Sequence, residues 1–279
     1  MNFWANASPL EIALPVDQRA WATALRLTMT DHAGVELDQD AAGYHPALRP
    51  AAERPYDPVN DFWVGQWGDR GVFVHRGPSE RTTGLHQALR RLDDLDLMIV
   101  MRAAELIDFH TNQAFCGRCG AATVVADWGR SRHCPGCAAE HFPRIDPAII
   151  VALIDQRDRL LLGHRVDWEP GQYSLFAGFV EAGESPEQTV AREVLEEVGL
   201  VVTDVAYQGG QPWPGPRSLM LSYRARADGQ PRPDGAEIEL AQWFSRAELT
   251  AGVADGRIVM PPASSVAHRL IGAWLAEGS

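Results

Sequence analysis

A group of glutamates around residues 184–197 is the part of the sequence best suited to chemistry. Glu193, Glu196 and Glu197 are spaced i, i+3 and i+4, which places their side chains on one helix face. Like charges at that spacing repel by roughly 0.2–0.5 kcal/mol per pair, and a solvated acidic face is one interpretation. Glu184 adds a carboxylate from the preceding loop. Because clustered oxygen ligands suit hard divalent cations, which bridge phosphate oxygens, we favour a metal site.

A helix must position these carboxylates, and its ends are marked in the sequence. Ser185 is a hydroxyl N-cap, Pro186 suits the first helical position, and Gln188 completes a capping box. Gly199 stands where a left-handed C-cap is expected. Between the ends, an apolar stripe that would face a core consists of Val190, Val194 and Val198.

This stretch follows the pattern G-x5-E-x7-R-E-U-x-E-E-x-G-U, where U is aliphatic. The pattern resembles the signature of the Nudix hydrolases. None of its constrained positions departs from it, and these are Gly178, Glu184, Arg192, Glu193, Val194, Glu196, Glu197, Gly199 and Leu200. The resemblance implies a metal-dependent hydrolase with an α/β/α sandwich fold.

The cysteines form a second constellation, spaced C-x2-C-x14-C-x2-C at Cys116, Cys119, Cys134 and Cys137. Tight turns are indicated by Gly117 and Gly120 in the first pair and Gly136 in the second. Four thiolates from two such turns suit tetrahedral Zn²⁺. Two disulfides are disfavoured in a cytosolic protein, and a redox site needs only one pair. A closed four-cysteine site has no open coordination position, so we expect a structural zinc.

A proline-rich array follows the glutamate helix and reads Gln211-Pro-Trp-Pro-Gly-Pro-Arg-Ser-Leu-Met220. Alone, Pro-Trp-Pro is typical of a rigid turn. Together with a four-cysteine ribbon before a Nudix segment, the array resembles SQPWPFPxSLM of the NADH pyrophosphatase (NudC-like) subfamily, and we interpret it as a substrate-contacting loop. Gly210 stands where that array has Ser, and Gly215 where it has Phe. Because Pro214 and Pro216 would hold the loop, Gly215 predicts an unchanged path and a roomier pocket.

The resemblance implies which residues hold the catalytic Mg²⁺ or Mn²⁺. Glu193 and Glu197 would be ligands, and Glu196 a further ligand or the base that orients water. Ala177 would offer its backbone carbonyl to the metal.

Three other acidic or basic positions complete the implied site. Glu184 would support the cluster, and Arg192 would hold the carboxylates by ion pairing. Glu237 matches a later metal-ligating glutamate of the subfamily, with Glu239 as its rival.

The implied substrate contacts come from several segments. Phe142 and Phe179 occupy the aromatic positions that sandwich nicotinamide, although a place in the core is the alternative for each. The remaining contacts would be Gln211, Pro212, Trp213, Pro214, Gly215, Pro216, Arg217, Ser218 and Ala267.

The implied reaction is attack of water on the pyrophosphate of NADH or NAD⁺, giving nicotinamide mononucleotide and AMP. Removal of an NAD cap from RNA 5′ ends uses the same chemistry and is the first alternative. A catalytically inactive nucleotide sensor is the second, and it predicts the loss of a carboxylate that this sequence retains. The resemblance also implies a homodimer.

Composition limits the function classes. A formal net charge of −12 argues against bulk polyanion binding, although the ribbon between Cys116 and Arg144 carries four arginines against one Asp and one Glu. No apolar run approaches the roughly 20 residues that cross a bilayer, and no signal-peptide pattern opens the chain. We therefore expect a cytoplasmic protein without a membrane segment.

We expect an N-terminal α/β domain over residues 1–112, a zinc ribbon over 113–143 and a Nudix domain over 144–279. In the first, residues 72–75 and 95–101 indicate strands, and 85–92 and 103–110 indicate helices. No catalytic constellation is evident there. In the last, we expect strands over 148–154, 160–162, 173–176, 201–205, 219–225 and 237–244, and helices from Arg246 and from Ser264 or Ser265.

Overall fold

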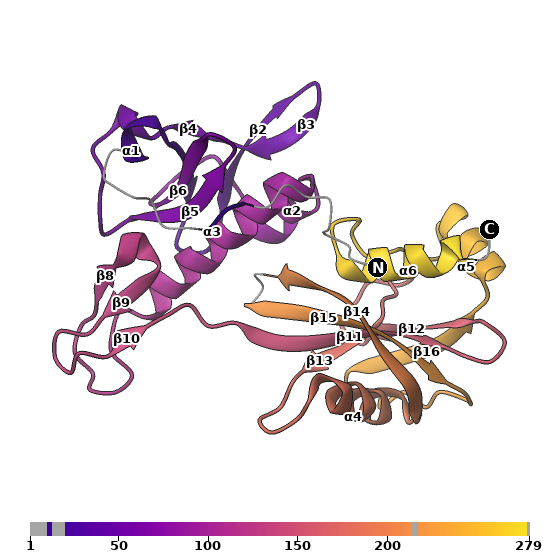
Figure 1. Cartoon of the computed structure of the whole chain (residues 1–279). Helices are drawn as coiled ribbons and strands as arrows, with labels where there is room; N and C mark the ends of the chain where they lie inside the picture. The colour runs from indigo at the N-terminus through magenta and orange to yellow at the C-terminus, as the bar shows by residue number, and fades with distance from the viewer. Residues whose placement is uncertain (1–9, 13–19, 214–216, 278–279) are drawn as a thin grey trace. The chain divides into compact units, whose positions relative to one another are not determined.

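The computed structural model describes residues 10–12, 20–213 and 217–277. The chain divides into two units, one built mainly from Asn6–Arg144 and the other from Ile145–Trp213 with Ser218–Ser279. Most elements of each unit are labelled in Figure 1. Among the described residues, no helix has the length and apolar character needed to span a bilayer.

The N-terminal unit is organised around a mixed sheet with the main strand order β3-β2-β1-β6-β5, in which β1 and β6 are parallel. Its strands are β1 (Leu25–Met29), β2 (Val35–Asp40), β3 (Gly43–Pro46), β4 (Arg49–Pro50), β5 (Asp61–Trp67), β6 (Arg70–Arg76) and β7 (Thr82–Thr83). Its helices are α1 (Ala20–Thr23), η1 (Ala51–Glu53), α2 (Leu85–Leu89) and α3 (Asp94–Asn112).

Helix α3 corrects one expectation. Residues 95–101, expected as a strand, form its first part. Leu97, Ile99, Val100 and Met101 are buried. A short apolar run is compatible with a buried strand or a buried helix, and here the helical spacing of 103–110 extends back through it.

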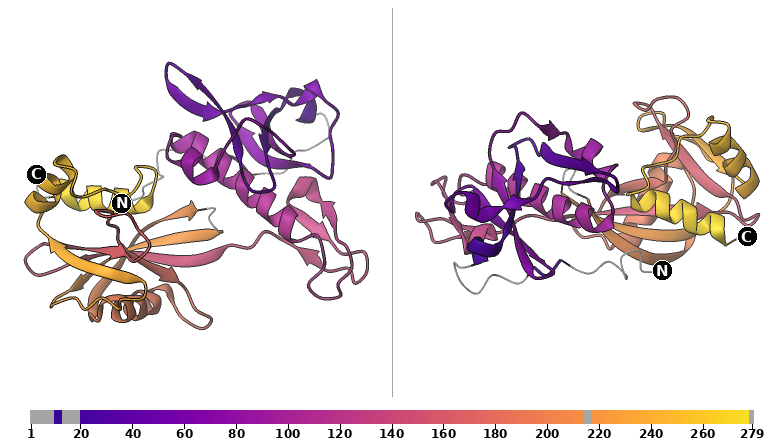
Figure 2. Two further views of the ribbon diagram at one scale, coloured as in Figure 1. Left: turned by 180° about the vertical axis from the view of Figure 1, so that it is seen from behind. Right: turned by 90° about the horizontal axis from the view of Figure 1, so that it is seen from above.

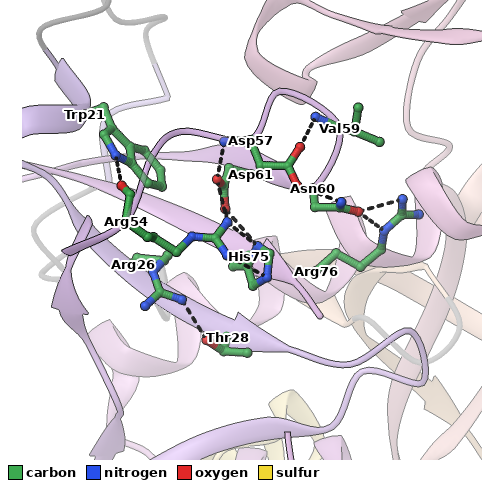
Figure 3. Close-up of polar contacts among 10 residues, drawn as sticks. All are labelled: Trp21, Arg26, Thr28, Arg54, Asp57, Val59, Asn60, Asp61, His75 and Arg76. Atoms are coloured by element: carbon green, nitrogen blue, oxygen red, sulfur yellow. Dashed lines mark hydrogen bonds and ion pairs between the residues drawn. The ribbon is translucent and has the colours of Figure 1, made fainter. Parts of the chain in front are cut away.

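A buried carboxylate ties the segment 54–61 to β6 (Figure 3). Asp61 is fully buried, and Arg54 Nη2 donates to both of its oxygens at 2.8 Å. His75 Nδ1 lies 2.9 Å from Asp61 Oδ1, and the backbone N–H of Asp57 donates to Oδ2 at 2.7 Å. A buried charge is tolerated when it is paired and hydrogen-bonded, so these contacts account for the burial of Asp61.

The four-cysteine segment belongs to the same unit and forms a small antiparallel sheet in the order β10-β9-β8. Its elements are β8 (Val124–Ala126), η2 (Asp127–Gly129), β9 (Ser131–His133) and β10 (Glu140–His141). His110 of α3 joins this sheet to the larger one. Its ring stacks on Phe62 at 3.8 Å between centroids, its Nε2 donates to the Gly129 carbonyl at 2.7 Å, and Arg132 donates to its Nδ1 at 3.0 Å.

The second unit is a sheet with helices on both faces. The strand order is β14-β15-β11-β12-β16, with β13 paired to β11, and only β11 and β15 are parallel. Helix α4 (Pro186–Val198) covers one face, and α6 (Val266–Ala276), with α5 (Arg246–Ala254) near it, lies at the other (Figures 1 and 2). The strands are β11 (Asp146–Ile154), β12 (Leu160–Arg165), β13 (Phe176–Phe179), β14 (Val202–Trp213), β15 (Ser218–Ala227) and β16 (Ile238–Phe244). This is the expected α/β/α sandwich.

Strand β11 contributes to both cores, which explains its apolar run over residues 148–154. Alternate residues Ile149, Val151 and Leu153 pack with the valine stripe of α4. The others, Ile150, Ala152 and Ile154, pack with α6 residues that include Leu270, Ile271 and Trp274.

Strand β13 differs from the expectation in its position. It begins at Phe176, not at residue 173, because Phe176–Phe179 pair with β11. Ser174 makes only an isolated bridge, to Gly163.

Candidate active site

Helix α4 begins and ends as the sequence predicts. The backbone N–H of Gln188 donates to Ser185 Oγ at 3.3 Å, and the N–H of Ser185 donates to Gln188 Oε1 at 2.8 Å. Gly199 adopts the left-handed conformation with φ 65°. All three valines of the stripe are fully buried, which fixes the rotation of the helix. The orientation of the glutamates follows from that rotation.

Arg192 connects three of the carboxylates. Its Nη1 donates to Glu193 Oε1 at 2.8 Å and to Glu196 Oε2 at 3.0 Å. Its Nε donates to Glu184 Oε1 at 2.7 Å, and its Nη2 donates to Glu184 Oε2 at 3.0 Å and to the Phe179 carbonyl at 2.9 Å. The hydrogen bonds from Arg192 are the main cause that lowers the pKa of Glu184 to about 2. One guanidinium thus ties the loop, β13 and the helix together.

Glu197 is the exceptional carboxylate of the group. It is only 4% exposed, whereas the Glu196 side chain is 59% exposed. Its Oε2 atom has no hydrogen-bond partner among the described residues. Burial raises its pKa to about 8, and the charges of Glu237 and Glu193 add to the increase. A buried carboxylate with a free oxygen, close enough to Glu237 and Glu193 for their charges to raise its pKa, is chemically suited to a hard divalent cation.

Gly178 makes room for Glu193. A Cβ atom at this position would lie 2.0 Å from Cδ and Oε1 of Glu193. Gly178 pairs with Ile149 in the β11–β13 ladder, so its backbone cannot move aside without breaking the sheet. Ala177, the residue before it, is half-buried and pairs with Ile150. The first position of the sequence pattern is therefore glycine because the carboxylate lies directly against the strand.

Glu237 and its rival Glu239 have different surroundings. Glu237 immediately precedes β16, forms an ion pair with Arg165 of β12, and its charge contributes to the raised pKa values of Glu193 and Glu197. Glu239 Oε2 lies 3.6 Å from His164 Nε2. The electrostatic neighbour of Glu197 is thus Glu237.

The proline-rich array is only partly a loop. Gln211–Trp213 end strand β14, and Ser218, which is buried, begins β15. Pro214, Gly215 and Pro216 lie outside the described residues, so the expectation for Gly215 stays a prediction. Of the other positions, Pro212 is exposed, and Trp213 and Arg217 are half-buried.

The side-chain amide of Gln211 is hydrogen-bonded within the fold. It is 1% exposed, its Nε2 donates to the Ser264 carbonyl at 2.7 Å, and its Oε1 accepts from the Val266 N–H at 2.7 Å. Val266 is the first residue of α6, so the amide satisfies one of the donors that a helix N-terminus leaves free. Ala267 follows it and is 5% exposed. Gln211 therefore holds the start of α6, where Ala267 lies.

Neither of the two singled-out phenylalanines is in a core. Phe179 ends β13 and is 47% exposed, and Phe142 follows β10 in the other unit and is 55% exposed. Large exposed aromatic rings are available for stacking.

The cysteines meet in one cluster, and all four sulfur atoms lie within 4.8 Å of one another. Cys116 Sγ lies 3.7 Å from Cys137 Sγ, and Cys119 Sγ lies 3.5 Å from Cys134 Sγ. Sulfur ligands arranged tetrahedrally at ~2.3 Å from zinc are about 3.8 Å apart, so the cluster fits Zn²⁺.

The two cysteine turns close in the same way. The N–H of Gly120 donates to the Cys116 carbonyl at 2.8 Å, and that of Ala138 donates to the Cys134 carbonyl at 2.9 Å. The left-handed residue of the second turn is Ala138, with φ 58°, where the sequence drew attention to Gly136.

Sequence reasoning missed two residues of the site. Arg165 reaches Glu237 through the pairing of β12 with β16, and no motif indicates it. Asp234 accepts hydrogen bonds from the backbone N–H groups of Ala236, Glu237 and Ile238. The Asp234-Gly235 dipeptide was the available signal, because Asp-Gly is typical of turns.

Two family models match the chain. Residues 144–262 match the NUDIX domain, and residues 111–142 match the NADH pyrophosphatase zinc ribbon domain. The chain is 43% identical over 198 residues to the NAD-capped RNA hydrolase NudC of Mycobacterium bovis (strain BCG / Pasteur 1173P2), which covers 67% of this chain and 63% of that relative. It is 38% identical over 201 residues to the NAD-capped RNA hydrolase NudC of Stutzerimonas stutzeri, which covers 72% and 70%.

Among solved structures, a NUDIX hydrolase from Nitrosomonas europaea covers 59% of this chain and 92% of its own, with 26% identity and a TM-score of 0.47. The chain spans less than two thirds of the length of the mycobacterial relative. The match to the Stutzerimonas relative, together with the two domain models in chain order, places the sequence in one family. The chain belongs to the Nudix hydrolases, in the NudC-like branch whose Nudix domain follows an NADH pyrophosphatase zinc ribbon.

Proposed function

We propose that the protein hydrolyses the pyrophosphate bond of NADH and NAD⁺ to nicotinamide mononucleotide and AMP. The observation that carries this proposal is the buried, partly unpartnered carboxylate of Glu197 on a complete Nudix helix that also carries Glu193 and Glu196. A buried carboxylate either takes up a proton or is stabilised in its charged form by a cation, and a divalent ion would supply that stabilisation here.

Glu193, Glu197 and Glu237 would hold Mg²⁺ or Mn²⁺, with the backbone carbonyl of Ala177 as a further ligand. When bound, such an ion neutralises charge that builds on the phosphate oxygens. Arg192 and Glu184 would keep Glu193 in place, because Arg192 donates hydrogen bonds to both Glu184 and Glu193. The identification of the ion as Mg²⁺ or Mn²⁺ is proposed from the family resemblance.

Glu196 is the candidate base because its side chain is accessible to water at 59% exposure. In the proposed step, a water oxygen attacks one phosphorus and gives up a proton to Glu196. The bond from that phosphorus to the bridging oxygen breaks, and the other mononucleotide leaves with the bridging oxygen. Arg192 donates to Glu196 Oε2 and so orients the carboxylate for this transfer.

Substrate recognition is proposed for the exposed rings of Phe179 and Phe142, which can stack on nicotinamide or adenine. The array from Pro212 to Ser218 and the start of α6 at Ala267 would contact the rest of the dinucleotide. Gln211 would contribute indirectly, because its amide is occupied by α6.

NAD-capped RNA is the second candidate substrate. Relatives at 37–43% identity are named NAD-capped RNA hydrolases. The zinc ribbon presents exposed arginines at Arg118 and Arg130, which suit a phosphate backbone. An inactive nucleotide sensor is disfavoured because every carboxylate of the pattern is present. We also propose a cytoplasmic homodimer, for which the family resemblance is the support.

The test is a product screen with the zinc-containing full chain. NADH, NAD⁺, ADP-ribose, diadenosine polyphosphates and NAD-capped RNA are each incubated with Mg²⁺ or Mn²⁺, and products are identified by mass spectrometry. We expect nicotinamide mononucleotide and AMP from NADH and NAD⁺, and no products with Glu197→Gln. Capped RNA turned over much faster than free NADH would favour the second candidate. Absence of pyrophosphate cleavage in every substrate would refute the proposal.

A further inference from the structure

The turn that precedes β16 is fastened to the end of α4. The backbone N–H of Arg232 donates to the Val198 carbonyl at 2.8 Å, and the N–H of Asp234 donates to the Glu197 carbonyl at 3.0 Å. The last carbonyls of a helix have no partner within the helix, and here the turn satisfies two of them. The turn is therefore held next to the residue that carries the buried carboxylate.

The side chain of Asp234 sets the path of this turn. Its Oδ1 accepts from the N–H groups of Ala236 at 3.2 Å, Glu237 at 3.1 Å and Ile238 at 2.9 Å. Its Oδ2 accepts from Glu237 at 3.3 Å. Gly235 completes the turn with φ 71° and donates to the Ile238 carbonyl at 3.0 Å. Because both carboxylate oxygens bind backbone N–H groups, Asp234 shapes the turn and is not itself placed as a metal ligand.

Glu237 is consequently held at both its backbone and its side chain. Asp234 fixes its N–H, its carbonyl accepts from the Val166 N–H at 3.1 Å, and Arg165 pairs with its carboxylate. A ligand that comes from outside the helix must be held within about 0.5 Å of its productive place. On the N-terminal side of Glu237, Asp234 makes the connection to α4: its N–H donates to the Glu197 carbonyl, and its carboxylate accepts from the Glu237 N–H.

We propose that Asp234 is a positioning residue that places Glu237 at the divalent-metal site. This inference rests on the proposed function, because it takes Glu193, Glu197 and Glu237 as the metal-holding residues. It means that metal affinity depends on a carboxylate that does not touch the metal.

The experiment measures Mn²⁺ binding to the zinc-containing full chain, without substrate, by the electron paramagnetic resonance signal of free Mn²⁺. Asp234→Ala should raise the Kd for Mn²⁺ at least about tenfold, the usual scale for loss of a group that orients a ligand. Asp234→Asn keeps an acceptor oxygen without the charge and should raise it roughly threefold. Asp228→Ala is the matched control, because Asp228 accepts from the Gln156 N–H at 3.0 Å and takes no part in the turn.

A double-variant cycle separates positioning from general destabilisation. In a Glu237→Gln background, Asp234→Ala should change the Kd by less than about twofold, because the ligand that it positions is gone. Melting temperatures are measured alongside, since a merely structural role would lower them without changing the Kd of the folded protein. If Asp234→Ala does not fold, Asp234→Asn decides in the same cycle.

Two failures are distinguishable. Glu237→Gln that binds Mn²⁺ like the unmodified protein would remove Glu237 from the proposed metal site and overturn the inference through its premise. The second failure requires that Glu237→Gln weakens Mn²⁺ binding. If the folded Asp234 variants then bind Mn²⁺ normally, or if their effects on the Kd add fully to that of Glu237→Gln, the positioning role alone is overturned.

Discussion

Replacing Glu197 with Gln should inactivate the protein and, in the absence of Mg²⁺ and Mn²⁺, stabilise it. Glu197 is 4% exposed, and its Oε2 has no hydrogen-bond partner among the described residues. Burial raises its pKa from 4.5 to about 8, with further contributions from the charges of Glu237 and Glu193. Glutamine has the shape of the protonated side chain and carries no charge, so it avoids the cost of burying one.

The sign of the pH dependence follows from this shift. Because the pKa in the folded state is raised, the stability contributed by protonated Glu197 is complete below pH 4.5, decreases up to about pH 8, and is lost above it. At about 1.4 kcal/mol per pH unit, the whole window corresponds to at most about 5 kcal/mol. Structural relaxation reduces this cost, and we expect ~2 kcal/mol, or about 4–8 °C in melting temperature.

Calorimetric melting of both proteins at pH 5 and pH 8.5, with zinc retained, tests this magnitude. Glu197→Gln should melt higher than the unmodified protein at pH 8.5 and close to it at pH 5. Turnover of NADH with Mg²⁺ should fall at least about a hundredfold. Glu196→Gln is the control, since the exposed Glu196 side chain should affect turnover but stabilise only slightly. An equal melting difference at both pH values, or near-normal turnover, would refute the reasoning.

Three further predictions concern other parts of the chain. Cys119→Ser should lose the bound zinc and yield poorly soluble protein, because structural zinc contributes folding free energy directly; elemental analysis showing no zinc in the unmodified, reduced protein would contradict this. Gly178→Ala should displace the Glu193 carboxylate and reduce turnover at least about tenfold, with the fold retained by circular dichroism; normal kinetics would show that Glu193 can move without loss. Burial lowers the pKa of His110 to about 3, so the unfolded chain takes up a proton first and the N-terminal unit should lose stability as the pH falls from 6.5 toward 3. His110→Gln should have a lower free energy of unfolding at pH 7, but that free energy should decrease less on acidification than in the unmodified protein. Urea-unfolding free energies that decrease equally with pH in both proteins would rule out a buried neutral histidine.

The features that the sequence predicted correctly depend on contacts between near neighbours in the chain. The caps of α4 are hydrogen bonds between Ser185 and Gln188 and the left-handed turn at Gly199. The valine stripe follows from helical spacing, and the cysteine turns close over a few residues. Interactions of this range are determined by the residue types themselves, so motif and spacing were sufficient.

The structure was needed wherever strand pairing or packing chose between locally equivalent options. Residues 95–101 suit a strand or a helix, and packing against the rest of the N-terminal unit selected α3. The hydrogen bonds of the Gln211 amide with Ser264 and Val266 join residues more than 50 positions apart, and no local pattern indicates them.

The choice between Glu237 and Glu239 shows the limit of sequence patterns most clearly. The two lie two positions apart in the sequence, so strand alternation gives them the same face and cannot tell them apart. The turn that leads to Glu237 is hydrogen-bonded to α4 at Glu197, and the charge of Glu237 raises the pKa of Glu197, while Glu239 lies next to His164. The proposal of Glu237 as a metal ligand therefore depends on tertiary hydrogen bonds, because the distance of this residue from the helix is not encoded in local spacing.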